Sequence, residues 1–245
     1  MLPIPAEELN GSGSLGPYWT FYRAVAAEQL RRWLPERRSV LLDMSGGRGR
    51  WGKQAAEAGH RVIEVIDFRL AGRDRPEPAG DIGQIRADDL GFLPDESVDG
   101  VVAEERALSV ELMAESAISD VARVLRPGGR ALICVDSLVL GMAILAEQNY
   151  WAHLCQTGEV MLVPWPDGSI TRCFSSGQLR ELLDGAGLEV EWMRPRTVLS
   201  PSTVDHVLAD DPDALAKLVR TELEAHPDDD DTVGIHLVAS ARKKD

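Results

Sequence analysis

Short apolar runs alternate with segments of helical periodicity along most of the chain. Each apolar run has the length of a buried strand and is bounded by glycine, proline, serine or charged residues. These runs predict strands over residues 39–44, 61–66, 84–87, 98–103, 130–136, 188–192 and 233–241. The periodic segments predict helices over residues 18–34, 51–58, 110–125 and 175–186, and one or two helices over residues 204–225.

Turn and capping residues indicate where several of these elements begin and end. Gly59 and Gly187 follow helical segments as stops, Ser175 or Ser176 can cap the helix over residues 175–186, and residues 127–129 form a turn before a strand. Strands that alternate with helices are typical of a doubly wound parallel sheet. The sequence therefore predicts an α/β fold with a mostly parallel, seven-stranded sheet.

Residues 137–173 interrupt the alternation. The pattern there is less regular, and it contains a group of aromatic, histidine and proline residues: Tyr150, Trp151, His153, Pro164, Trp165 and Pro166. We expect this segment to be an insertion that lies over the sheet. With 44% hydrophobic residues, the 245-residue chain can build a substantial core, and we expect a single domain over residues 1–245.

Composition and charge exclude several classes of partner. The formal net charge of -14 repels phosphate backbones, and there is no basic stripe with interleaved aromatics, so we expect no nucleic-acid substrate. No apolar run approaches the ~20 residues that span a bilayer, and the first residues lack the layout of a signal peptide. We therefore expect a cytoplasmic protein that contacts no membrane. Cys134, Cys155 and Cys173 show no CxxC pair and no nearby histidine cluster, so no metal site is indicated.

The glycine-rich segment after the first predicted strand is the first candidate for chemistry. Asp43 ends the strand, and Ser45, Gly46, Gly47 and Gly49 separate it from the next helix. Small residues let a ligand approach the backbone, and the free amides at a helix N-terminus favour a carboxylate or phosphate. Asp43 could orient these amides or meet an ammonium group.

Two classes of nucleotide cofactor compete for this turn. Residues 47–52 match GxGxxG, and Asp67 lies twenty residues beyond Gly47, as the ribose acid of a dinucleotide fold does. A dinucleotide fingerprint begins directly at the end of the strand, however, whereas residues 43–46 intervene here. The additional acid favours another cofactor.

The segment instead resembles the first motif of class I S-adenosylmethionine-dependent methyltransferases, with Asp43, Gly47 and Gly49 in matching places. Further stretches resemble that family in the same order: residues 87–89 with 93–94 and 97–102, residues 123–130, and residues 174–188. The resemblance implies a Rossmann-like methyltransferase fold. Residues 17–136 would then form the cofactor-binding half, residues 137–173 would cap the substrate, and residues 174–245 would supply the C-terminal helices and strands.

The resemblance also implies roles for individual residues toward S-adenosylmethionine. The methionine end of the cofactor would lie over the turn formed by Asp43, Ser45, Gly46, Gly47 and Gly49. The ribose hydroxyls would be held by Asp67, and the adenine amino group would be met by Asp88, with Asp89 beside it. Ala103 and Glu104, at the end of the fourth strand, and Tyr18, on the leading helix, would complete the cofactor site.

Two positions depart from the family pattern. Ser45 stands where the family has its first glycine, and Ile66 stands where the family has its ribose acid, so that Asp67 comes one residue late. Because a shift of one residue along a strand reverses the face to which a side chain points, Asp67 can serve only if the strand ends or bulges before it. Glu64 is a weaker substitute for this role.

The acceptor side is less defined by sequence. For a hydroxyl acceptor a general base would help, and His153, Glu104 or Glu105 could supply it. A histidine in an aromatic stretch also fits simple packing. Glu104 would lie where such sheets open their ligand site, at the carboxyl ends of the strands, but it also fits a capping or surface acid. The remaining histidines, among them His236 near the last strand, suggest no site.

Three functional hypotheses remain. The first is methyl transfer from S-adenosylmethionine to a small molecule. The second, motivated by Ser45 and the displaced Asp67, is a protein that binds S-adenosylmethionine but has lost methylation and acts as a cyclase-type enzyme or a regulator. The third is a nicotinamide-linked oxidoreductase, for which the literal GxGxxG is the only support.

Overall fold

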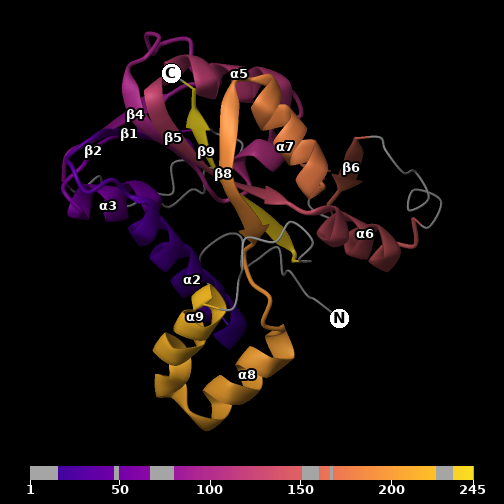
Figure 1. Ribbon diagram of the computed structural model, residues 1–245. Coiled ribbons are helices and arrows are strands. Elements are labelled where there is room, and N and C mark those ends of the chain that lie inside the picture. Colours follow the sequence, from indigo (N-terminus) through magenta and orange to yellow (C-terminus); the bar gives the residue numbers. More distant parts are fainter. Residues whose placement is uncertain are drawn as a thin grey trace.

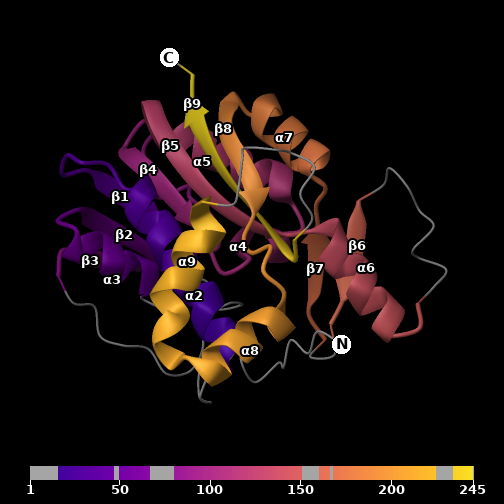
Figure 2. The same ribbon diagram turned by 60° about the horizontal axis from the view of Figure 1, so that its bottom comes forward.

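The computed structural model describes residues 16–46, 50–66, 80–150, 160–165, 168–224 and 234–244. Within these residues, seven strands form a central sheet in the order β3-β2-β1-β4-β5-β9-β8. Figure 1 shows this sheet, and Figure 2 also labels its edge strand β3. Their bounds are β1 Val40–Asp43, β2 Arg61–Ile66, β3 Ile82–Arg86, β4 Val98–Ala103, β5 Leu125–Asp136, β8 Leu188–Pro195 and β9 His236–Lys243. Strands β1 to β5 are mutually parallel, and β9 pairs antiparallel with both β5 and β8. The predicted α/β class and the mostly parallel sheet are confirmed.

Helices cover both faces of this sheet. Their bounds are α2 Pro17–Trp33, α3 Arg50–Glu57, α4 Ala107–Val110, α5 Ala114–Val124, α6 Leu138–Glu147, α7 Ser176–Gly185, α8 Pro201–Asp210 and α9 Leu215–Glu224, with a short 3-10 turn Pro212–Ala214 between the last two. Leu42 and Val101 pack with apolar residues of α5 and α7, whereas Leu41 and Val102 pack toward α2 and α3. Successive residues of a strand point to opposite faces, so an apolar run without alternation serves both layers.

Two smaller units flank the sheet. Strands β6 Met161–Pro164 and β7 Ile170–Cys173 form an antiparallel pair, against which α6 packs. Helices α8 and α9 pack against the N-terminal part of α2 around Tyr18, Phe21 and Val204, and Figure 2 shows these three helices side by side. None of the described helices has the length and apolarity needed to cross a bilayer.

The structure corrects three of the predicted elements. The helix expected over residues 110–125 begins only at Ala114, as α5, because Glu111 is extended and its carboxylate accepts a hydrogen bond from the Met113 amide at 3.2 Å; the short α4 ends at Val110. Residues 127–129 do not precede β5 but form a bulge within it, and Gly128 takes φ +72° there. The segment 137–173, expected to be irregular, contains α6 and the β6–β7 pair.

One edge of the sheet collects the ends of several strands. Because β1, β4 and β5 are parallel, their carboxyl ends meet at the same edge. Strand β8 runs in the same direction, since it is antiparallel to β9, so its end at Pro195 and the start of β9 at His236 also lie there. Open α/β sheets bind ligands at this edge, which makes it the expected position of the functional site.

Candidate functional site

Asp43 organises the turn between β1 and α3. Its buried carboxylate accepts hydrogen bonds from the Ser45 amide at 2.9 Å and from the Gly52 amide, in the first turn of α3, at 2.7 Å. A Cβ at Gly52 would lie 3.1 Å from Asp43 Oδ2, so the glycine allows α3 to approach the acid closely. Burial raises the pKa of Asp43 to about 6, although the hydrogen bonds from Ser45 and Gly52 oppose this shift. Gly47 and Gly49 of the predicted turn lie outside the described residues.

Ser45 connects this turn to the end of β4. Its hydroxyl accepts a hydrogen bond from the Glu104 backbone amide at 3.0 Å, and its side chain is buried. Gly46 follows with φ +86°, a conformation that favours glycine. The departure from the family's glycine therefore has a structural use, since the added hydroxyl joins two loops that line the same edge of the sheet.

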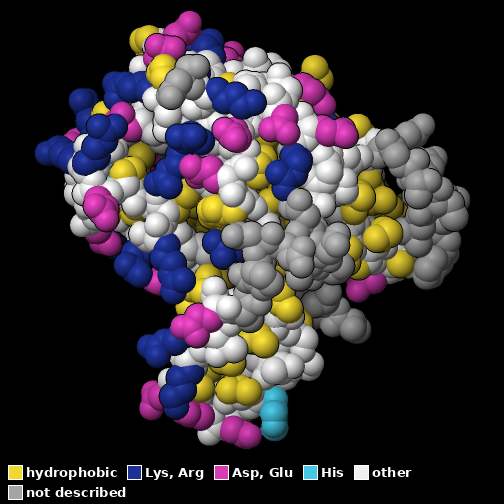
Figure 3. Space-filling view, viewed as in Figure 1, with side chains coloured by type: hydrophobic (Ala, Val, Ile, Leu, Met, Phe, Trp, Pro, Cys, Tyr) yellow, Lys and Arg dark blue, Asp and Glu magenta, His cyan; other side chains and the backbone are white. Residues whose placement is uncertain are grey.

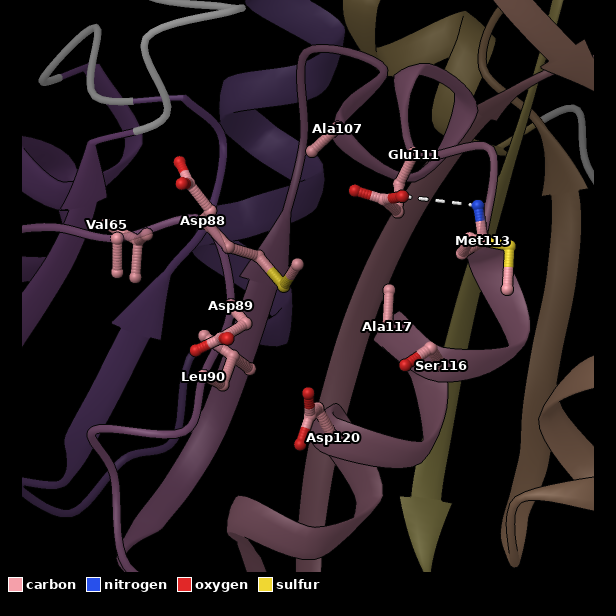
Figure 4. Close-up of a pocket in the computed structure, with 12 residues that line it drawn as sticks. Val65, Asp88, Asp89, Leu90, Ala107, Glu111, Met113, Ser116, Ala117 and Asp120 are labelled. Carbon is pink, nitrogen blue, oxygen red and sulfur yellow. Dashed lines mark hydrogen bonds between the residues drawn. The ribbon is translucent and has the colours of Figure 1, made fainter.

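A pocket of about 170 Å³ opens beside the turn. Met44, Val65, Leu90 and Ala107 form much of its apolar lining, and Figure 4 shows acidic and hydroxyl side chains around them. Further lining residues come from the loop between α4 and α5 and from α5 itself: Glu111, Met113, Ser116, Ala117 and Asp120. Sites for whole ligands are commonly ~300–1,000 Å³, so this pocket has the size for one ring system rather than a whole cofactor.

Asp88 and Asp89 both line this pocket, on the loop after β3. The Asp89 carboxylate accepts a hydrogen bond from the Gly91 amide at 2.9 Å and so shapes the loop. Asp88 is exposed, and no described residue donates a hydrogen bond to its carboxylate. Of the two predicted acids, Asp88 therefore has its acceptor oxygens available for a ligand.

Glu104 forms a buried ion pair on the other side of the turn. Its carboxylate accepts from Arg196 Nη2 at 2.5 Å, and both side chains are almost fully buried. Arg196 follows β8, and its Nη1 donates to Gln29 Oε1 of α2 at 2.7 Å. The nearby anionic carboxylate of Glu104 raises the pKa of Arg196 well above its ordinary value, despite the opposing effect of burial. The pair joins β4, β8 and α2 at the carboxyl edge.

A second polar cluster lies at the end of β5. Arg106 donates to both carboxylate oxygens of Asp136, with its two shortest contacts at 2.8 Å. Burial alone would raise the pKa of Asp136, but Arg106 and the adjacent His236 hold it below its ordinary value. His236 Nε2 lies 3.4 Å from Asp136 Oδ1, and His236 Nδ1 is 2.9 Å from the Tyr22 hydroxyl. The sequence does not predict this cluster, because its four members come from four separate segments.

The predicted site residues are distributed unevenly in the structure. Asp43, Ser45, Gly46, Ala103 and Glu104 meet at the turn and the adjoining end of β4, and Asp88 and Asp89 face the neighbouring pocket. Tyr18 is not brought to this group: it packs among α2, α8 and α9, and its hydroxyl is 2.8 Å from Thr197 Oγ1. Asp67 follows the last residue of β2 and lies outside the described residues, as does His153. Both remain predictions.

Glu64, the weaker substitute for the ribose acid, is buried within β2. Its carboxylate accepts a hydrogen bond from Gln84 Nε2 of β3 at 2.7 Å. A buried carboxylate that already has a neutral donor is poorly placed to accept from ribose hydroxyls. Glu64 is therefore a poor candidate for the ribose, and the assignment to Asp67 stays a prediction.

A family model matches part of the chain. Residues 42–133, from β1 into β5, match the family described as "Methyltransferase domain". No curated protein matches the chain.

Solved structures resemble the whole fold. The Burkholderia thailandensis 1,6-didemethyltoxoflavin-N1-methyltransferase, solved with 1,6-didemethyltoxoflavin and S-adenosylhomocysteine, is 21% identical with a TM-score of 0.59, and the match covers 93% of this chain and 81% of that one. An S-adenosylmethionine-dependent methyltransferase from Mesorhizobium loti is 18% identical with a TM-score of 0.59, covering 91% and 100%. The 4+2 cyclase SpnF is 18% identical with a TM-score of 0.56, covering 89% and 80%. At these identities the likeness establishes the fold.

Proposed function

Because the chain is a class I S-adenosylmethionine-dependent methyltransferase, we propose that it methylates a small molecule bound at the carboxyl edge of its sheet. The observation that carries the proposal is the Asp43 turn, with the Asp88 carboxylate at the neighbouring pocket, where no described residue donates a hydrogen bond to it. The net charge of -14 and the intermixing of acidic and basic side chains on the face in Figure 3 support a metabolite rather than a nucleic acid.

The residues present fit the cofactor. Asp43 occupies the amides of Ser45 and Gly52, which a pyrophosphate would need, and its negative charge favours an ammonium group instead. The apolar lining with Asp88 at its rim suits a flat heterocycle that carries an amino group. These features support S-adenosylmethionine over a nicotinamide dinucleotide.

We assign the methionine end of the cofactor to Asp43, Ser45 and Gly46 with Gly47 and Gly49, its ribose to Asp67, and its adenine amino group to Asp88. When bound, S-adenosylmethionine supplies an electrophilic methyl group on a sulfonium. A carboxylate that accepts a hydrogen bond from a hydroxyl or amino group contributes about 1.5–3 kcal/mol where it is sheltered from water. The acids thus fix the orientation of the cofactor relative to the acceptor.

The acceptor would lie beyond Glu104, toward the segment 137–173. Helix α6 begins directly after β5 ends, and Trp165 at the end of β6 lies under the Arg106 guanidinium at 4.1 Å. These contacts support residues 137–173 as the cap over the acceptor. Placement of the acceptor in line with the methyl group can supply up to about 7–11 kcal/mol of the rate enhancement.

Calorimetry with S-adenosylhomocysteine tests the cofactor assignment. We expect Asp88→Ala and Asp67→Ala each to weaken binding by about 10-fold or more, one sheltered hydrogen bond corresponding to about 1.5 kcal/mol. Asp95→Ala, which removes an exposed acid shortly after the pocket loop, is the matched control and should bind as the parent does. Unchanged binding in Asp88→Ala would refute the adenine assignment.

Product analysis tests the methyl transfer. The purified parent is incubated with S-adenosylmethionine and a panel of phenols, amines and carboxylic acids, and S-adenosylhomocysteine is measured by mass spectrometry. Formation that depends on an acceptor supports the proposal. Tight binding of S-adenosylmethionine without transfer to any acceptor would favour the cyclase-type or regulatory alternative.

A further inference from the structure

Three side chains from distant segments lie in a row at the carboxyl edge of the sheet, one pair joined by a hydrogen bond and the other by a close contact. The hydroxyl oxygen of Tyr22, on α2, lies 2.9 Å from His236 Nδ1, and His236 Nε2 lies 3.4 Å from Asp136 Oδ1. Asp136 ends β5 and His236 begins β9, so sheet pairing places them opposite each other. We call these residues the Tyr22–His236–Asp136 chain.

The chain is joined to the elements that carry the proposed cofactor site. Arg106, which binds Asp136, lies two residues after Glu104, and the Glu104 amide is hydrogen bonded to Ser45 of the cofactor turn. Glu105 and Arg106 both adopt positive φ, at 56° and 65°. Such backbone costs about 1–3 kcal/mol per residue and persists where the surroundings impose it. The strained loop thus presents Arg106 to Asp136 beside the turn.

The fold alone does not require this arrangement. Burying a phenol, an imidazole and a carboxylate costs free energy that apolar residues of similar volume would avoid. Two buried polar atoms here, Arg196 Nε and His236 Nε2 itself, have no hydrogen-bond partner among the described residues. Tyr22 itself is only partly buried, although its hydroxyl meets His236.

Charge fixes the tautomer of His236. Asp136 is held ionised by Arg106, and an ionised carboxylate faces an N–H group in preference to a lone pair. The proton of a neutral imidazole then resides on Nε2, toward Asp136. Nδ1 keeps its lone pair and accepts from the Tyr22 hydroxyl, whose oxygen retains lone pairs for another donor.

We propose that the Tyr22–His236–Asp136 chain is a proton relay that takes the proton of a hydroxyl acceptor, a phenol or an enol, during its methylation. This inference rests on the proposed function. The acceptor oxygen forms a bond to the methyl carbon, while the carbon–sulfur bond breaks and leaves its electron pair on sulfur. The acceptor proton passes to Tyr22 Oη as the tyrosine's own proton passes to His236 Nδ1, and Asp136 stabilises the resulting imidazolium.

The surrounding charges favour oxygen over nitrogen as the acceptor atom. The Arg196 guanidinium carbon lies 5.7 Å from the Tyr22 ring centroid, and Arg106 stands at the other end of the chain. Both guanidinium groups repel an alkylammonium acceptor, although each is paired with a carboxylate, Arg196 with Glu104 and Arg106 with Asp136. Burial raises the pKa of Tyr22 well above its ordinary value, so Tyr22 stays protonated and takes the proton of a phenol only as its own proton passes to His236 Nδ1.

The test uses two phenols that differ in acidity. At mildly alkaline pH 4-nitrophenol is ionised and needs no base, whereas phenol keeps its proton. A positioned general base accelerates the chemical step by at least about 100-fold. Tyr22→Phe and His236→Gln should therefore each lower kcat/KM for phenol by about that factor. For 4-nitrophenol the loss should be less than about 5-fold. His206→Gln, an exposed histidine on α8, is the control and should change neither rate. Equal losses on the two phenols would overturn the relay and indicate a structural role.

A second measurement does not depend on turnover. Nitrogen-15 histidine spectra of the S-adenosylhomocysteine complex, assigned by comparison with His236→Gln, should show Nε2 protonated and Nδ1 shifted in Tyr22→Phe. A proton on Nδ1 would contradict the proposal. If the parent methylates an amine probe and neither phenol, the proposal of a hydroxyl acceptor is wrong. Retained binding of S-adenosylhomocysteine would then leave the cofactor assignment intact.

Discussion

The buried ion pair between Glu104 and Arg196 permits a quantitative prediction about stability. Both side chains are almost fully buried, and Arg196 is also hydrogen bonded to Gln29. Replacing one partner of such a pair leaves the other charge buried without compensation, which costs about 3–5 kcal/mol. In a chain of this size 1 kcal/mol corresponds to about 2–4 °C. Arg196→Met should therefore lower the melting temperature by about 6–20 °C.

A double-mutant cycle separates the ion pair from loss of packing. Glu104→Gln removes the charge that Arg196→Met leaves unpaired, so the double variant should recover part of the lost stability. Arg38→Met breaks the exposed pair with Asp81, with side chains 70% and 49% accessible, and should cost less than about 1 kcal/mol. Urea unfolding followed by tryptophan fluorescence measures all four variants. The reasoning is refuted if Arg196→Met is no more costly than Arg38→Met.

Three further predictions concern local structure. The pKa of Asp43 is raised by burial from 3.8 to about 6. Its contribution to the free energy of unfolding is therefore fully present at pH values below 3.8 and is lost as the pH rises through about 6. Urea unfolding across this range should show that the stability advantage of the parent over Asp43→Asn declines. Gly141→Ala would place a Cβ 2.8 Å from Met161 Sδ and 2.9 Å from Cys173 Sγ and should cost about 1–3 kcal/mol in thermal unfolding, whereas Gly185→Ala, with open space around it, should not destabilise. Ser175→Ala removes the capping box of α7 and should cost about 1 kcal/mol by the same measurement; no loss would show that the cap is dispensable.

The sequence by itself determined the elements whose signals are local. Strands β2 and β4 have the predicted bounds, and α7 begins at its predicted serine cap. The alternation of strands and helices fixed the parallel class of the sheet, because a parallel pair requires a crossover that a helix usually supplies. The acid-and-glycine turn was equally visible, since all its residues lie within one short segment.

Only the tertiary structure decided which side chains meet. In the sequence Ser45 is only a departure from the glycine of the family motif, yet its hydroxyl accepts a hydrogen bond from the amide of Glu104, 59 residues away. Tyr22, Asp136 and His236 carry no local signal, and β9, which brings His236 to Asp136, is the last strand of the chain but sits between β5 and β8. Periodicity encodes which face of an element is buried, whereas contacts between distant segments depend on strand order and packing. For that reason the cofactor turn was predictable from the sequence and the polar cluster beside it was not.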